Sequence, residues 1–116
     1  MEAIITETLD TLKEYIPRLV RASESIAENL QGGDQYEAMQ QLPHYFEGIE
    51  WVVSALNGIG KNGVDIDIET SSLNDFLKEA EEAITHQDYI LLADLLEYEF
   101  TPILEQWLKK SSEVVG

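Results

Sequence analysis

Residues 5–30 read ITETLDTLKEYIPRLVRASESIAENL, and this stretch decides the fold. Its apolar side chains recur at alternating spacings of four and three residues, at Ile5, Leu9, Leu12, Ile16, Leu19, Ile26 and Leu30. Ser23 occupies the one slot of this series that lacks an apolar side chain. A helix with such spacing buries one face, so the stretch predicts a long amphipathic α-helix that packs against other helices.

Three more helices are predicted downstream, each from a cap residue and an apolar series. Gly32 and Gly33 end the first helix, and Asp34 is a favoured cap for the second. Ser72 and Asp88 are the expected caps of the third and fourth. The inner positions are Ala38, Met39, Leu42, Tyr45, Phe46, Ile49, Val52, Val53 and Leu56, then Leu73, Phe76, Leu77, Ala80 and Ile84, and finally Leu92, Leu96, Phe100, Ile103 and Trp107.

Each of the three prolines falls within a predicted helix. Proline removes a backbone hydrogen bond and its ring crowds the preceding turn, so we expect kinks near Pro17 and Pro43. Thr101 and Pro102 suit the start of a helix, so the fourth helix is expected to kink or split there.

The chain is predicted to be one all-α domain over residues 1–116. It comprises a helical hairpin over about 3–57, a glycine-containing linker over about 58–71, a second hairpin over about 72–110 and a short tail over 111–116. A shift of 54 residues aligns Asp34 with Asp88 and Leu42 with Leu96, which suggests an internal duplication. Two stacked hairpins predict a four-helix bundle.

The charge of the chain narrows its partners and its compartment. Twenty-three acidic and seven basic residues give a net charge of −16, which disfavours direct binding to nucleic acid and to anionic membranes. No apolar run approaches the roughly 18 residues of a membrane-spanning helix. The first residues lack the basic character of a signal peptide, and there is no cysteine. We therefore expect a cytoplasmic protein.

No motif for catalysis, metal binding or cofactor binding is complete. Neither histidine, His44 or His86, belongs to the Glu-x-x-His unit of di-iron bundles. An EF-hand loop beginning at Asp65 would need glycine where Thr70 stands. The glycines of residues 58–63 are not followed by the Gly-Lys-Ser/Thr of a phosphate loop. The sequence therefore predicts no enzyme, no metal site and no cofactor.

The aromatic residues are the best candidates for contacts with a partner. Aromatic side chains fill cores, and they are also enriched at the energetic centres of protein interfaces. Trp51 lies off the main apolar series of its helix, beside a stripe that Tyr45 and Val52 make unusually wide. We take Tyr45, Trp51, Val52 and, in the second hairpin, Tyr98 as candidate partner-facing residues.

The segment from Asp88 to Trp107, with LLADLLEYE at residues 91–99 and Pro102, resembles a segment of small uncharacterised acidic helical proteins from Gram-positive bacteria. The resemblance covers about a fifth of the chain. It implies a helical fold and brings no activity, ligand or catalytic residue. Residues 47–51, EGIEW, are similar to another such segment.

Three functions remain open from the sequence. The first is a non-enzymatic protein–protein interaction module whose partner is either an unidentified protein or a second copy of the chain. The second is a small secretion or flagellar chaperone that clasps an amphipathic helix. The third is an acidic mimic of nucleic acid that inhibits a DNA-binding protein. The affinity of the chain for that protein would then fall steeply as the salt concentration rises.

Overall fold

Helices make up most of the computed structural model, which describes residues 2–114. In chain order they are α1 (Ala3–Gln31), α2 (Gln35–Lys61), the 3-10 turn η1 (Thr70–Leu73), α3 (Asn74–Thr85), α4 (Tyr89–Leu95), the π-helical segment η2 (Leu96–Phe100) and α5 (Thr101–Glu113). Residues 2–114 contain no strand, so the predicted all-α class is confirmed.

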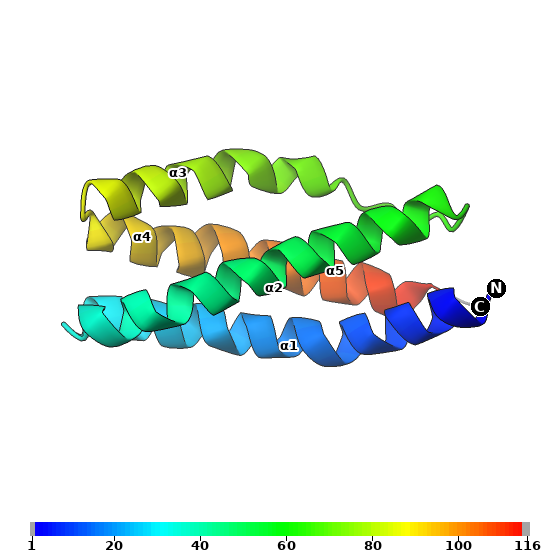
Figure 1. Cartoon of the computed structure of the whole chain (residues 1–116), viewed down its shortest axis with the longest axis horizontal. Coiled ribbons are helices and arrows are strands. Elements are labelled where there is room, and N and C mark those ends of the chain that lie inside the picture. Colours follow the sequence, from blue (N-terminus) through cyan, green and yellow to red (C-terminus); the bar gives the residue numbers. More distant parts are fainter. Residues whose placement is uncertain (1, 115–116) are drawn as a thin grey trace.

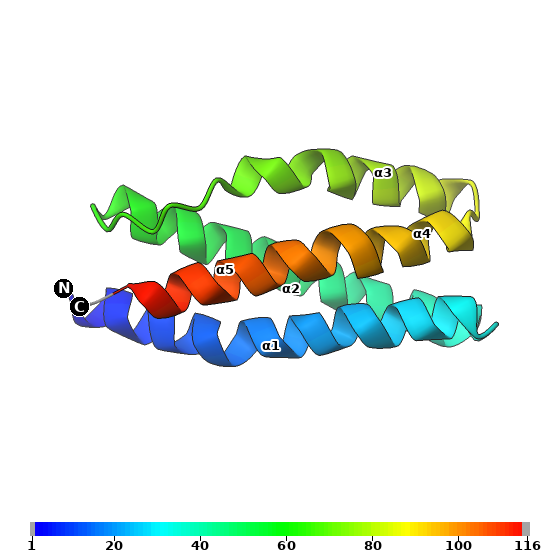
Figure 2. The same ribbon diagram turned by 180° about the vertical axis from the view of Figure 1, so that it is seen from behind.

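The helices form four antiparallel rods (Figures 1 and 2). The first three are α1, α2 and α3, and the fourth is α4, η2 and α5, which follow one another without a gap. α1 packs against α2 on one side and against α4 and α5 on the other, while α3 packs against α4. This arrangement is the predicted four-helix bundle, and α1 is its most widely contacted member.

The two hairpin turns have the same geometry. The N–H of Asp34 donates to the carbonyl of Asn29, and the N–H of Asp88 donates to that of Ala83, both over 2.8 Å. Each aspartate then caps the next helix by accepting a backbone N–H three residues on. The residue before each aspartate has a positive φ, 87° at Gly33 and 54° at Gln87. This geometry recurs at the 54-residue offset that the sequence suggested.

The third helix starts differently from the expectation. Ser72 does not cap it; its hydroxyl donates to the carbonyl of Glu69 within the 3-10 turn. α3 then begins at Asn74, with Leu73 in the cap position and no side-chain cap. The expected cap was wrong because the 3-10 turn already supplies backbone partners at this end.

The prolines interrupt no rod. α1 and α2 run through Pro17 and Pro43, and Figure 1 shows α1 as a bowed ribbon. Before Pro102 the chain widens into η2, where the carbonyl of Leu96 accepts both the backbone N–H and the hydroxyl of Thr101. The fourth rod therefore changes from a π-helical to an α-helical segment at Thr101 without a break between them, and no side chain caps α5.

The π-helical segment also shifts the buried face of the fourth rod. A π turn holds more residues than an α turn, so later side chains rotate around the axis. Leu104 is fully buried, whereas Ile103, the expected core residue, is only partly buried. The rod continues to Glu113 with Ser111 buried, so the predicted tail over 111–116 is helical to that point.

The connector between the hairpins is shorter than expected and is anchored to the bundle. α2 extends to Lys61, four residues past the predicted end at Asn57. In the following loop Ile66 is buried while Asp65 and Asp67 are exposed. Lys110 of α5 donates to the carbonyl of Asp67 over 2.8 Å and to its carboxylate over 2.9 Å. This pairing lowers the pKa of the Asp67 carboxyl and fixes the loop on the fourth rod.

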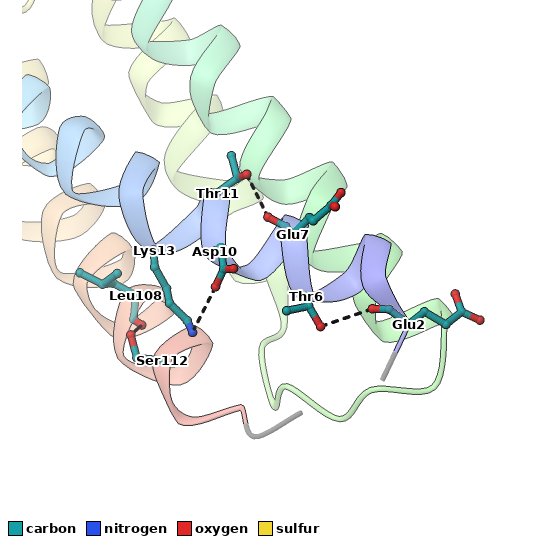
Figure 3. A network of polar contacts seen from close by, with 8 residues as sticks. All are labelled: Glu2, Thr6, Glu7, Asp10, Thr11, Lys13, Leu108 and Ser112. Carbon is teal, nitrogen blue, oxygen red and sulfur yellow. Dashed lines mark hydrogen bonds and ion pairs between the residues drawn. The ribbon is translucent and has the colours of Figure 1, made fainter.

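The polar contacts drawn in Figure 3, near the start of α1 and the end of α5, join residues three or four positions apart in the sequence. The hydroxyl of Thr11 donates to the carbonyl of Glu7, and that of Ser112 to Leu108, each over 2.9 Å. Lys13 pairs with Asp10 at 3.9 Å. Exposed contacts of this kind contribute little, so burial of the apolar faces holds the bundle together. None of the helices in residues 2–114 is both long enough and apolar enough to traverse a bilayer.

Candidate functional site

A groove of about 380 Å³ lies between α1 and α2, and we call it the α1–α2 groove. Leu19, Ala22 and Ile26 of α1 and the ring of Tyr45 give it an apolar floor. Its full lining is Tyr15, Arg18, Leu19, Ala22, Ile26, Glu37, Gln40, Gln41, His44 and Tyr45. An apolar hollow of a few hundred Å³ with a small number of polar groups at its edge is the usual form of a binding site.

At one end of the groove Tyr15, which lines it, packs against Trp51, which lies just outside the lining. Tyr15 and Trp51 meet edge to face, with ring centroids 5.5 Å apart and an interplanar angle of 83°. Such pairs contribute about 0.5–1.5 kcal/mol beyond their buried area. Trp51 nevertheless keeps 43% of its surface exposed. A large apolar ring is thus held in place at the surface, beside an apolar floor.

Gly48 allows this pair to form. Tyr15 crosses α2 at this glycine, and a Cβ there would collide with the Tyr15 hydroxyl and would lie 2.8 Å from Cδ2 of Leu19. Glycine within a helix costs about 1 kcal/mol relative to alanine, so its presence in the middle of α2 needs a reason. The close approach of α1 supplies it.

Replacing Gly48 with alanine is expected to destabilise the fold by about 1 kcal/mol, because the cost of overpacking exceeds the gain in helix propensity. Gly58→Ala is the matched control, since no atom lies within 4 Å of a Cβ at that position of the same helix. That variant is expected to be more stable than the wild type by up to about 1 kcal/mol. Urea unfolding followed by circular dichroism measures both. Equal gains in unfolding free energy from the two substitutions would contradict this prediction, because they would show that the Tyr15 side chain can move away from residue 48 without destabilising the fold.

The floor of the groove hides a polar contact between Ser23 and Tyr45. Both residues are buried, and their hydroxyl groups are hydrogen-bonded to each other. Burial raises the pKa of the Tyr45 phenol far above its ordinary value, and the hydrogen bond between Tyr45 and Ser23 only partly opposes this. Ser23 thus fills the gap in the apolar series because it satisfies the hydroxyl of a tyrosine from the neighbouring helix.

The other end of the groove carries a small hydrogen-bonded network. The side-chain amide of Asn29 donates to the amide oxygen of Gln41 over 2.7 Å. The amide nitrogen of Gln41 donates in turn to the hydroxyl of Ser25 over 3.3 Å. These bonds tie α1 to α2 where the apolar floor ends, so the groove has two defined ends.

The edges of the groove carry charges of both signs. Arg18 lies on the α1 side, and Glu37 and His44 lie on the α2 side. His44 stands 3.9 Å from the exposed carboxylate of Glu47. No carboxylate of the described residues lies within ion-pair distance of Arg18, although Glu14 is only one turn away. The guanidinium of Arg18 is therefore available to a partner.

Of the four residues predicted to face a partner, two are buried and two are exposed. Tyr45 and Val52 keep 2% and 0% of their surface exposed, so their placement at the surface was wrong. Both complete the core because α1 covers the wide stripe of α2. Trp51 and Tyr98 are exposed. They lie on different rods, and among the described aromatic pairs none joins them.

Sequence reasoning missed Tyr15, Arg18 and Gly48. Tyr15 and Arg18 flank the apolar series of α1 and look like ordinary surface positions. The available signal was Gly48, a helix-disfavouring residue within a strong apolar series, which indicates close approach of another element. A cluster of three or more histidine, aspartate or glutamate side chains suited to a metal ion is not found within residues 2–114. The groove combines an apolar floor with charged and amide side chains at its edges.

A family model described as a domain of unknown function (DUF8042) matches residues 7–110. This range spans all four rods, and it includes both hairpin turns and every residue that lines the groove. Comparison with curated proteins and with solved structures gives no match.

Proposed function

Since the chain belongs to the DUF8042 family, whose description assigns no activity, we propose from the α1–α2 groove that it is a protein–protein interaction module. The proposal rests on one observation, the exposure of Trp51. Its surface is 43% exposed, and its ring packs edge to face against Tyr15 at the end of the apolar groove. Tryptophan is among the residues most enriched at the energetic centres of protein interfaces. We place this function in the cytoplasm, since a chain without cysteine suits a reducing compartment.

A photo-crosslinking experiment tests the proposal. Benzoylphenylalanine replaces His44, whose side chain is exposed at the edge of the groove, and in a matched variant it replaces Glu79 on the exposed side of α3. Irradiation of cells is expected to give a protein adduct from position 44 and none from position 79. Adding Trp51→Ala is expected to lower the affinity about thirtyfold, as the loss of an interface anchor does, and so to remove the adduct. No adduct at position 44, or equal adducts at both positions, contradicts the proposal.

The salt dependence of the crosslinked adduct distinguishes an interaction module that binds through its groove from an acidic mimic of nucleic acid. Contacts made through an apolar groove persist at about 0.5 M salt, whereas association through exposed carboxylates is largely screened there. An adduct that forms only at low salt would favour the mimic. An adduct made up solely of secretion substrates would favour the chaperone.

A further inference from the structure

We propose that the partner of the α1–α2 groove is a second copy of this chain, bound about a two-fold axis that runs parallel to the helices. This inference rests on the proposed function and names the partner of the same site. It is carried by the pattern of charges and aromatic rings along the edges of the groove, which is complementary to itself.

The contacts between α1 and α2 show which of their residues lie at the same position along the bundle axis, which we call the same height. Tyr15 contacts Trp51, Ser23 bonds to Tyr45, and Gln41 bonds to Ser25. Because the two helices are antiparallel, these contacts place Arg18 of α1 at the height of residues 47–51 of α2. Glu47 and Glu50 are the carboxylates exposed at that height, and Glu47 is the one that lies beside His44 at the edge of the groove.

A two-fold axis parallel to the helices lays α1 of each copy over α2 of the other at unchanged height. Arg18 of one copy then faces Glu47 of the other, and the same pair forms again by symmetry. Tyr15 of one copy covers the exposed edge of Trp51 of the other. Glu14 faces the uncharged Ser54, so no like charges meet at these positions.

The alternative two-fold axis, perpendicular to the helices, is disfavoured by the same charges. It lays α1 of one copy over α1 of the other, and an axis that passes at the height of Arg18 brings the two Arg18 side chains together. Opposing like charges across an interface cost several kcal/mol. The charges at the edges of the groove therefore favour the parallel axis over a perpendicular axis at that height.

The face is large enough for a specific dimer. Helices of 29 and 27 residues are about 40 Å long, and two of them side by side are about 20 Å wide. A face of roughly 800 Å² results, which is the area that each partner contributes to a standard interface. The net charge of −16 on each copy opposes association at low salt, so added salt is expected to strengthen the dimer.

Sedimentation equilibrium of the purified full chain tests the inference, at about 0.05 and 0.5 M salt. The wild type is expected to dimerise with a dissociation constant in the micromolar range. Arg18→Glu and Glu47→Arg, each alone, are expected to raise that constant about tenfold at the higher salt, and the double variant is expected to restore it. Lys78→Glu on α3 is the matched control, because it changes the net charge as much as Arg18→Glu does and lies away from the groove.

Folding is checked by circular dichroism and urea unfolding, which substitutions at these exposed positions are expected to leave almost unchanged. A monomeric wild type at both salt concentrations overturns the dimer, and so does a dimer that both single reversals leave intact or that the double variant fails to restore. A monomer that still crosslinks from position 44 to another protein would overturn this inference alone, while the proposed function would stand. No adduct of any kind at that position would overturn both.

Discussion

Above pH 10, the wild-type chain is expected to lose about 1.4 kcal/mol of unfolding free energy per pH unit more than the Tyr45→Phe variant loses. Tyr45 is buried in the floor of the groove, and burial raises the pKa of its phenol above the ordinary value of about 10. The unfolded chain releases this proton near pH 10, whereas the folded chain keeps it. Stability is therefore complete below pH 10 and falls as the pH rises toward the raised pKa.

The curves of unfolding free energy against pH for the wild type and for Tyr45→Phe are expected to cross. Near pH 8 the Tyr45→Phe variant is less stable than the wild type by about 1–2 kcal/mol, because the buried hydroxyl of Ser23 loses its partner. The steeper loss of the wild type then brings the two curves together near about pH 11. Urea unfolding at a series of pH values measures both effects. Because the four other tyrosines are present in both proteins, their titration cancels in the difference.

Ser23→Ala combined with Tyr45→Phe is the control for the hydrogen bond. Removing both hydroxyl groups leaves no unpaired donor, so the double variant is expected to lie close to the wild type near pH 8. If the unfolding free energies of the wild type and Tyr45→Phe change with pH in parallel, water reaches the Tyr45 phenol and its side chain is not buried in the bundle.

The architecture was predictable because it depends on periodicity and caps. The series from Ile5 to Leu30 needs one buried face over 26 residues, and only a long helix in a bundle provides it. Asp34 and Asp88 cap their helices as predicted, because their side chains act on the backbone three residues away. Such local effects do not depend on how the rods are arranged.

The candidate site was less predictable because its residues depend on which helix covers which face. The wide stripe containing Tyr45 and Val52 suggested a surplus apolar surface, yet α1 covers it. The exposure of Trp51 follows from Tyr15 and Gly48, which lie 33 residues apart in the sequence and meet only in the bundle. The π-helical segment likewise replaces Ile103 by Leu104 in the core, and no simple period marks it.

Phe100→Ala is expected to destabilise the chain by about 3–5 kcal/mol, the usual cost of removing a buried phenylalanine ring. Phe100 is fully buried at the last position of η2. Its ring centroid lies 6.2 Å from that of Tyr45 and 6.3 Å from that of Phe46. Small domains are stable by only about 5–15 kcal/mol, so this loss lowers the urea midpoint by a large fraction of its value.

Tyr98→Ala is the matched control, because Tyr98 belongs to the same π-helical segment and keeps 64% of its surface exposed. Its removal is expected to change the unfolding free energy by no more than about 0.5 kcal/mol. The pair separates two explanations for η2. A large loss for Phe100→Ala alone means that the segment is held by the ring inserted among Tyr45 and Phe46. Comparable losses for both variants would mean that the π-helical segment is easily disrupted at any position, and the packing of Phe100 against Tyr45 and Phe46 would then not be what joins the two hairpins.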